Sequence, residues 1–202
     1  MTIKSIDTRY GGCLFRSRLE ARWAVCFDHM GIAWEYEPQG FEVDDRLALG
    51  APDAFRYLPD FWLTDLDVWA EVKGSLTHEE SYRLLSAASS LSSPLGGCND
   101  GGGKDVVVFG PLTTGQVVGT PIRLHLHKGD LQASCWACPV HENYSTIAND
   151  AGQVAPNAST ALLRGYACMR HNVHSDYLAA LDAGRTARFE HGRRPRKAGA
   201  PA

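Results

Sequence analysis

Apolar and polar positions alternate most clearly between Tyr57 and Gly74, where the sequence reads Y-L-P-D-F-W-L-T-D-L-D-V-W-A-E-V-K-G. Aromatic and β-branched residues occupy both ends of this stretch, and the turn-like T-D-L-D at 64–67 separates them. The pattern predicts two strands, Tyr57–Leu63 and Val68–Gly74, joined as an antiparallel hairpin. The register that this loop implies pairs Leu63 with Val68, Trp62 with Trp69, Phe61 with Ala70 and Asp60 with Glu71.

The two faces of this predicted hairpin differ in polarity, because side chains on a strand alternate between faces. One face is entirely apolar and must face a core, and it consists of Phe61, Leu63, Val68, Ala70 and Val72. The other face carries charge and consists of Leu58, Asp60, Trp62, Trp69, Glu71 and Lys73.

Asp60 and Glu71 are the candidate metal ligands. Two carboxylates directly opposite each other on a sheet have Cβ atoms about 5 Å apart and repel, so stability does not explain them. A hard cation such as Mg²⁺ or Mn²⁺ takes carboxylate oxygens and keeps several waters for chemistry. Lys73, on the same face, could orient an attacking water or stabilise charge on a phosphate. The alternative is a hairpin with solvent-facing charges, since D-x(n)-E-x-K matches are common by chance.

Helical periodicity is strongest over Leu14–Met30, and Gly31 supplies a stop signal. A second helix is predicted over Thr77–Ser92, with Thr77 as its cap and Glu80 three residues later. Residues Met1–Cys13 are expected to form a loose lead-in. The remaining predicted elements are strands over Ala33–Glu37, Phe41–Val43, Asp105–Phe109 and Ile122–His127, the last an edge strand, and helices over Pro156–Arg170 and Ser175–Glu190. This order predicts an α/β sandwich.

The composition is that of a globular protein. The chain has 202 residues, of which 44% are hydrophobic and 21% charged, which is typical of one globular domain with room for a small appended module. No apolar run approaches the roughly 20 residues that a membrane span needs, and the first residues lack the apolar segment of a signal peptide. We therefore expect a cytoplasmic protein that does not enter the membrane.

The net charge of −3 does not by itself indicate nucleic-acid binding, but the distribution of the basic residues does bear on it. Basic residues cluster on the first predicted helix and at the end of the chain, and local basic patches beside an acidic metal site suit a phosphodiester substrate. A solvated helix face and a disordered tail are the alternative explanation. The candidate DNA contacts are Arg16, Arg18, Arg22, Arg193 and Arg194.

Cysteine spacing indicates a second metal site. The pairs Cys135-Trp-Ala-Cys138 and Cys168-Met-Arg-His171 have the ligand count of a tetrahedral structural Zn²⁺ site, with His174 or His141 as substitutes for His171. Unpaired core thiols and redox chemistry remain alternatives, whereas a disulfide does not suit a reducing cytosol. An HNH-type nuclease that uses His171-Asn172 would leave the face with Asp60, Glu71 and Lys73 unexplained.

Pro59-Asp60 followed by Glu71-x-Lys73 resembles the PD-(D/E)xK nuclease superfamily. The upstream segments F-R-S-R-L-E-A-R-W at 15–23, W-E-Y-E-P at 34–38 and Y-L-P-D-F at 57–61 look like the small nucleases of bacteriophages and prophages. Tn7-type transposase endonucleases and phage Holliday-junction resolvases are more distant look-alikes. The resemblance covers roughly the first half of the chain and fades after Gly110. It implies that Glu20, on the first helix, joins the site.

Together these features predict a metal-dependent DNA nuclease, most simply an endonuclease, that uses Mg²⁺ or Mn²⁺ at Asp60 and Glu71. The resemblance implies a restriction-endonuclease-like core, a mixed sheet flanked by helices, over residues 1–128. A small helical, zinc-binding extension is expected over 129–190 and a basic disordered tail over 191–202. The competing hypothesis is a non-cleaving DNA- or protein-binding module on the same fold. The oligomeric state is left open, with a homodimer among the options.

Overall fold

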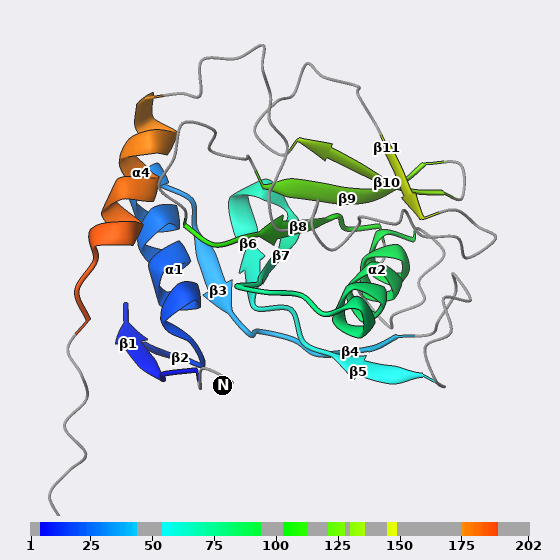
Figure 1. The fold of residues 1–202 in the computed structure, drawn as a ribbon, viewed down its shortest axis with the longest axis horizontal. Coiled ribbons are helices and arrows are strands. Elements are labelled where there is room, and N and C mark those ends of the chain that lie inside the picture. The colour runs from blue at the N-terminus through cyan, green and yellow to red at the C-terminus, as the bar shows by residue number, and fades with distance from the viewer. Residues whose placement is uncertain are drawn as a thin grey trace, which may run out of the picture.

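A mixed β-sheet forms the centre of the protein in the computed structural model, which describes residues 5–43, 54–93, 103–112, 121–127, 130–135, 145–148 and 175–189 (Figure 1). Seven of the described strands belong to this sheet, in the order β11-β10-β9-β8-β7-β6-β3. All neighbours are antiparallel except β7 and β8, which are parallel. The strands are β3 (Trp34–Tyr36), β6 (Phe61–Leu63), β7 (Val68–Val72), β8 (Val106–Phe109), β9 (Ile122–His127), β10 (Asp130–Cys135) and β11 (Ser145–Ala148).

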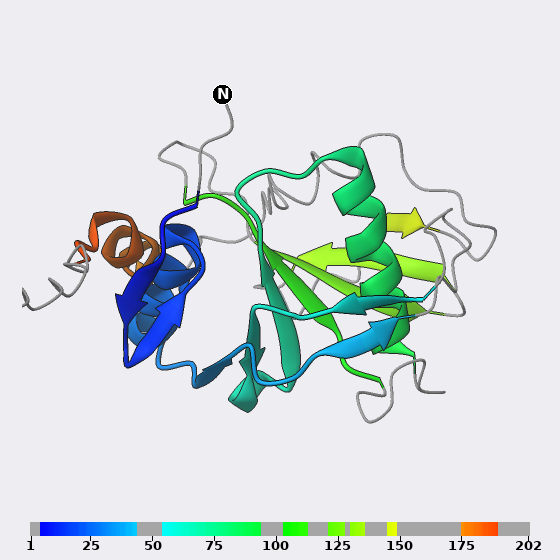
Figure 2. The same ribbon diagram turned by 90° about the horizontal axis from the view of Figure 1, so that it is seen from below.

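Helices cover both faces of this sheet, as Figure 2 shows. The described helices are α1 (Arg18–Met30) and α4 (Ser175–Thr186), which pack together on one face, and α2 (His78–Ser92) on the other. A two-stranded sheet of β4 (Phe41–Val43) and β5 (Phe55–Tyr57) lies on the α2 side. The mixed α/β class that the sequence predicts is therefore confirmed.

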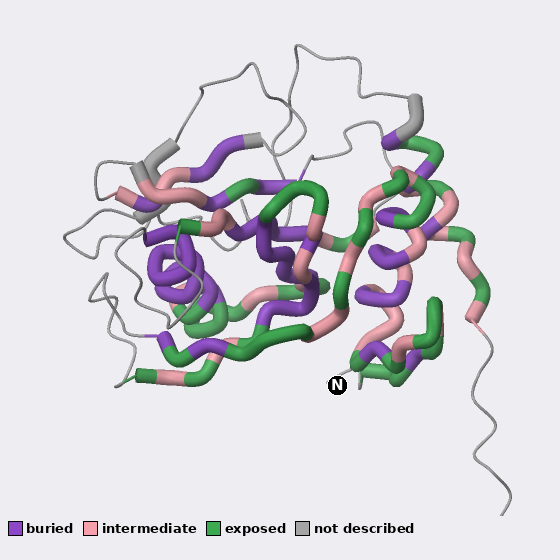
Figure 3. The backbone as a smooth tube through the Cα atoms, turned by 180° about the vertical axis from the view of Figure 1, so that it is seen from behind, coloured by how far each residue is buried: buried purple, intermediate pink, exposed green. Residues whose placement is uncertain are grey.

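Strand β8 divides its side chains between two apolar cores. Val106 and Val108 lie in the core under α2, whereas Val107 and Phe109 lie in the core under α1, and all four are completely buried. A strand with a parallel neighbour and helices on both faces is expected to be apolar throughout, because neither face meets water. Figure 3 shows the resulting buried centre of the sheet.

The predicted hairpin register is confirmed. Strand β6 pairs with β7 through Phe61–Ala70, Trp62–Trp69 and Leu63–Val68, and the loop between them is a 3-10 turn (Thr64–Leu66) followed by Asp67 with a positive φ of 55°. All five residues of the predicted apolar face lie in the core under α1.

The prediction of one continuous strand over Tyr57–Leu63 is wrong. Tyr57 ends β5 in the small sheet, and Phe61 begins β6 in the central sheet. Pro59 lies between them, lacks an N–H for a sheet ladder and restricts the backbone of Leu58. The second strand is also shorter than predicted and ends at Val72 rather than Gly74.

The first helix begins four residues later than predicted. Ser17 is its N-cap, and Gly31 ends it in the left-handed conformation, as its predicted stop role requires. The expected loose lead-in instead contains a hairpin of β1 (Thr8–Tyr10) and β2 (Cys13–Phe15). Gly11 and Gly12, at φ of 54° and 83°, form its two-residue turn, a geometry that favours glycine at both positions.

Helix α2 begins with the predicted capping box, in which Thr77 and Glu80 exchange hydrogen bonds between side chain and backbone. Strand β9 has its predicted bounds but lies between β8 and β10, so the edge-strand prediction is wrong. The boundary predicted after residue 128 falls within the β9–β10 hairpin. The helix predicted over Pro156–Arg170 lies outside the described residues.

Helix α4 packs closely on α1. It is shorter than the predicted Ser175–Glu190 and ends at Thr186. A Cβ atom at Gly184 would overlap the Cys26 sulfur and the Arg22 carbonyl oxygen, so only glycine permits this approach. Among the described helices, none has the length and apolarity to cross a membrane.

Candidate active site

Asp60 lies directly before β6 and is held by three contacts. Its Oδ2 accepts a hydrogen bond from the Val72 backbone N–H of the neighbouring strand at 2.7 Å, and its Oδ1 accepts one from Arg16 Nη2 at 2.8 Å. Its backbone oxygen accepts from the Glu37 N–H at 2.9 Å. The residue is 2% exposed, so the end of β3, the start of β6 and the end of β7 together enclose this carboxylate.

Glu71 faces Asp60 one position beyond the last observed pair of the β6–β7 ladder. It is also 2% exposed, and each carboxylate oxygen has one partner. Lys73 Nζ lies 2.5 Å from Oε1, and the Tyr57 hydroxyl donates a hydrogen bond to Oε2 at 2.7 Å. The three residues predicted from the hairpin, Asp60, Glu71 and Lys73, therefore come together.

The electrostatics of this pair is that of two buried like charges. Burial raises the pKa of the Asp60 carboxyl well above its ordinary value, and the Glu71 carboxylate raises it further, against the opposing effects of Lys73 and the Val72 N–H. Burial and Glu71 also raise the pKa of Tyr57 well above 10.0, so its hydroxyl stays protonated and remains a donor. Such a pair is costly unless cations compensate it.

The donor set fits a small hard cation. Within the described residues, no three Asp, Glu, His or Cys side chains form a metal-binding group, so Asp60 and Glu71 would be its two protein carboxylates. Mg²⁺ is commonly bound by one or two carboxylates, with waters and substrate phosphates completing its coordination. The raised pKa of Asp60 is consistent with a metal site, because the repulsion between Asp60 and Glu71 causes part of the rise and a divalent ion would remove that repulsion.

Lys73 leaves the sheet at the end of β7. Its backbone N–H donates to the Phe109 oxygen of the parallel strand β8 at 2.9 Å, which fixes the backbone of Lys73 beside the sheet. The ammonium group is half-buried, with 32% of the side chain exposed. Burial alone would lower the pKa of Lys73, but Glu71 and Asp60 raise it above 10.5, so the group stays a cation beside the two carboxylates.

Glu20, in the first turn of α1, is 7% exposed and forms a separate hydrogen-bonded group. The Tyr36 hydroxyl donates to Oε2 and the Ser17 hydroxyl to Oε1, each at 2.6 Å. The Arg16 backbone N–H donates to Oε2 at 3.2 Å. Glu20 is thus near the site without contacting Asp60, although its charge adds slightly to the rise in the Asp60 pKa.

Arg16 joins these groups. Its guanidinium contacts Asp60 and also lies 2.5 Å from Glu37 Oε1, through Nε. Arg16 precedes α1, whereas the other two arginines that were predicted on the first helix, Arg18 and Arg22, do lie on it. Both are half-buried, and no hydrogen bond or ion pair among the described residues links them to the carboxylates. The predicted contacts Arg193 and Arg194 lie outside the described residues.

Sequence reasoning missed Tyr36, Tyr57 and Glu37. The two tyrosines each donate to one acidic side chain of the site, Glu20 or Glu71. The segments Y-E-P at 36–38 and Y-L-P-D at 57–60 carry them, but periodicity along one strand cannot reveal partners that come from distant strands. The pairing of Tyr36 with Phe61 in the β3–β6 ladder is the feature that would have located Tyr36.

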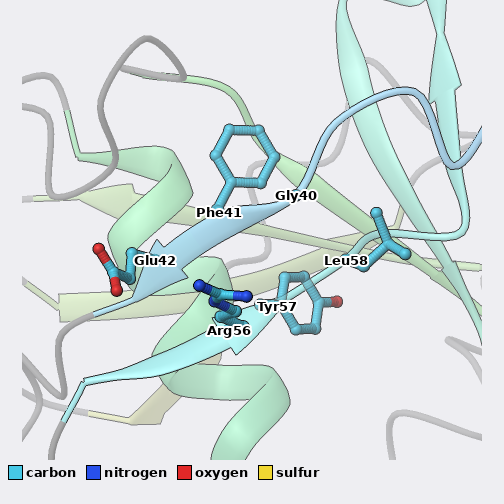
Figure 4. Close-up of a pocket in the computed structure, with 6 residues that line it drawn as sticks. All are labelled: Gly40, Phe41, Glu42, Arg56, Tyr57 and Leu58. Carbon is cyan, nitrogen blue, oxygen red and sulfur yellow. The ribbon is translucent and has the colours of Figure 1, made fainter.

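A pocket of about 590 Å³ adjoins the site (Figure 4). Its described lining comes from the β4–β5 sheet and from the residues on either side of it. Tyr57 takes part in both structures, since its ring lines the pocket while its hydroxyl reaches Glu71. The lining residues are Gly40, Phe41, Glu42, Arg56, Tyr57 and Leu58.

The predicted zinc site lies outside the described side chains. Only the backbone of Cys135 is described, as the end of β10, and Cys138, Cys168 and His171 are not. Comparisons with protein families, with curated proteins and with solved structures found no match.

Proposed function

We propose that this protein is a metal-dependent DNA nuclease of the PD-(D/E)xK type with a restriction-endonuclease-like core. One observation carries the proposal: two buried carboxylates, Asp60 and Glu71, face each other across adjacent strands, and the Lys73 ammonium group pairs with Glu71. Structural stability alone does not account for this arrangement, because burying two like charges costs free energy that apolar side chains would not.

The proposed roles follow from position. Asp60 and Glu71 would hold Mg²⁺ or Mn²⁺, and that ion would polarise the phosphate and lower the pKa of a bound water. Lys73 Nζ, beside Glu71, would orient the attacking water and stabilise negative charge on the phosphate. Glu20 lacks a direct contact with Asp60, so its proposed role is to position Arg16 and Tyr36 at the edge of the site.

DNA as the substrate comes from the family resemblance and from the cations at the site. Arg16 and Lys73 lie on either side of the carboxylate pair, one on Asp60 and one on Glu71. A phosphodiester that approached the two acidic residues would meet both cations, which would offset its own charge.

The test is cleavage of plasmid, linear and branched DNA by the purified protein, with Mg²⁺ or Mn²⁺ and with chelator. We expect metal-dependent cleavage of at least one substrate. Asp60→Asn, purified identically, is the control for a contaminating nuclease, because it retains an acceptor for the Val72 N–H while removing the charge. Activity that survives chelator or that is unchanged in Asp60→Asn would refute the proposal. Metal-independent DNA binding without cleavage would favour the binding-module alternative.

A further inference from the structure

Arg16 occupies an unusual position for a substrate contact, because it is bound to the proposed metal ligand. Its Nη2 donates to Asp60 Oδ1 and its Nε pairs with Glu37. The Arg16 side chain is 57% exposed, whereas Asp60 is 2% exposed. A solvent-accessible cation thus covers one oxygen of a buried carboxylate.

The net formal charge of the site matches the charge of one divalent ion. Formally, the carboxylates of Glu20, Glu37, Asp60 and Glu71 face the cations Arg16 and Lys73, which leaves two negative charges. All four oxygens of Asp60 and Glu71 already have protein partners. A divalent ion on Asp60 would repel the guanidinium on the same carboxylate, so the two cations compete for Oδ1.

We propose that Arg16 is released from Asp60 when a divalent cation binds and then contacts a phosphate of the DNA. This inference rests on the proposed function and adds a coupling between metal and DNA binding. The planar guanidinium of arginine matches a phosphate in a two-pronged geometry, and an exposed guanidinium can reach a ligand without moving the backbone.

Glu37 keeps the released side chain near the site. Its backbone adopts a positive φ of 47°, which is uncommon for a glutamate, and its N–H donates to the Asp60 oxygen. This backbone contact anchors Glu37 beside Asp60 independently of Arg16. The Arg16 backbone N–H is fixed by Glu20 and Tyr36, so only the end of the side chain has to move.

The first measurement is the affinity of the DNA-free protein for Mn²⁺, by titration calorimetry. Arg16→Ala should bind Mn²⁺ about tenfold more tightly than wild type, the size expected for one charge about 5 Å from a divalent ion in a water-like dielectric. Arg16→Gln, which keeps a neutral hydrogen-bond donor, should also bind Mn²⁺ more tightly than wild type. An unchanged or weakened Mn²⁺ affinity in both variants would overturn the inference.

The second measurement is the affinity for a short fluorescent DNA duplex with and without Ca²⁺, with the DNA checked for integrity afterwards. Ca²⁺ should tighten DNA binding by wild type about tenfold more than by Arg16→Ala. Arg9→Ala is the matched control, because Arg9 is an exposed arginine of β1. It should leave the effect of Ca²⁺ unchanged. An equal effect of Ca²⁺ in wild type and Arg16→Ala would also overturn the inference.

These outcomes separate the two proposals. Failure of wild type to bind Mn²⁺ or to cut DNA refutes the nuclease function. Metal-dependent cleavage by wild type, together with an Arg16→Ala variant whose Mn²⁺ affinity and Ca²⁺ effect match wild type, refutes the role of Arg16 alone.

Discussion

The two faces of β7 meet opposite demands. On one face, Val68, Ala70 and Val72 lie in the apolar core under α1, where other apolar side chains surround them. On the other face, Trp69 packs against Phe41 with a ring-centroid distance of 5.0 Å, and two residues later Glu71 is buried just as deeply. Burial stabilises the protein at every one of these positions except Glu71.

The cost at Glu71 is visible in the number of groups arranged around it. A tyrosine hydroxyl and a lysine hold its two oxygens, and an arginine and a backbone N–H hold those of Asp60. A buried carboxylate needs such partners because it has lost its hydration. One strand thus stabilises the fold through one face and presents charged groups through the other, so changes to the two faces should have separable effects.

Phe61→Ala tests the apolar face and should have the largest effect. Phe61 is completely buried and contacts the rings of Phe15, Phe27, Trp34 and Tyr36. Its truncation should lower the free energy of unfolding by about 3–5 kcal/mol, measured by chemical denaturation. Leu66→Ala, in the exposed turn of the same hairpin, is the control and should cost little. A loss below about 1 kcal/mol for Phe61→Ala would contradict the stabilising role of the apolar face.

Lys73→Ala tests the opposite face. Removal of one electrostatic group of this kind costs about 10²–10³ in rate, and we expect that loss in single-turnover cleavage with a smaller loss of DNA affinity. Lys104→Ala is the matched control, because Lys104 pairs with Asp67 at the far end of the hairpin and is more exposed. Weakened binding with an unchanged single-turnover rate would make Lys73 a phosphate contact only.

Tyr57→Phe tests one hydrogen bond of the charged face, because it removes a single oxygen atom. The ring would still line the pocket, but Glu71 Oε2 would lose its donor. We expect kcat/KM to fall about tenfold, the scale of one hydrogen bond to a charged group. Tyr10→Phe removes a comparable bond to Asp28 away from the site and should leave cleavage unchanged. Equal losses in both variants would show a general effect on the fold.

Thr77→Ala should have the smallest effect, because it removes the N-cap of α2 without touching the site. The expected loss is about 1 kcal/mol in the free energy of unfolding, with cleavage unchanged. The Thr77 N–H and hydroxyl also lower the pKa of Glu80. That contribution is present above the unfolded-state value of about 4.3 and is lost as pH falls through the lower folded-state value. Glu80→Gln should therefore abolish this acid-dependent part of the wild-type stability curve.

The parts of the fold that local patterns encode were predictable. The register of β6 and β7, the cap of α2 and the stop at Gly31 each depend on residues close together in the sequence. Pro59 indicated a break in the predicted strand Tyr57–Leu63, but the aromatic residues around it favoured a continuous strand. The hairpin of β1 and β2 was hidden because Gly11-Gly12 indicates a turn equally well in a loose segment.

The carboxylates of the site were predictable and their partners were not. Asp60 and Glu71 lie on neighbouring strands of one hairpin, so period-two alternation brings them together. Tyr57 reaches Glu71 from the small β4–β5 sheet, whereas Tyr36, on β3, holds Glu20, and Glu37, directly after β3, holds Arg16. Those contacts depend on which distant strands pair and on how the β4–β5 sheet packs on the central sheet, which no local pattern along the sequence contains.

The most direct test of the central claim is a crystal structure of the protein with Mn²⁺, with the metal located by its anomalous scattering. We predict a peak within ligand distance of oxygens from both Asp60 and Glu71, and its loss in crystals of Asp60→Asn. A structure at saturating Mn²⁺ in which the carboxylates keep only Arg16, Lys73, Tyr57 and the Val72 N–H as partners, with no peak between them, would contradict the assignment of this site as a metal-dependent nuclease centre.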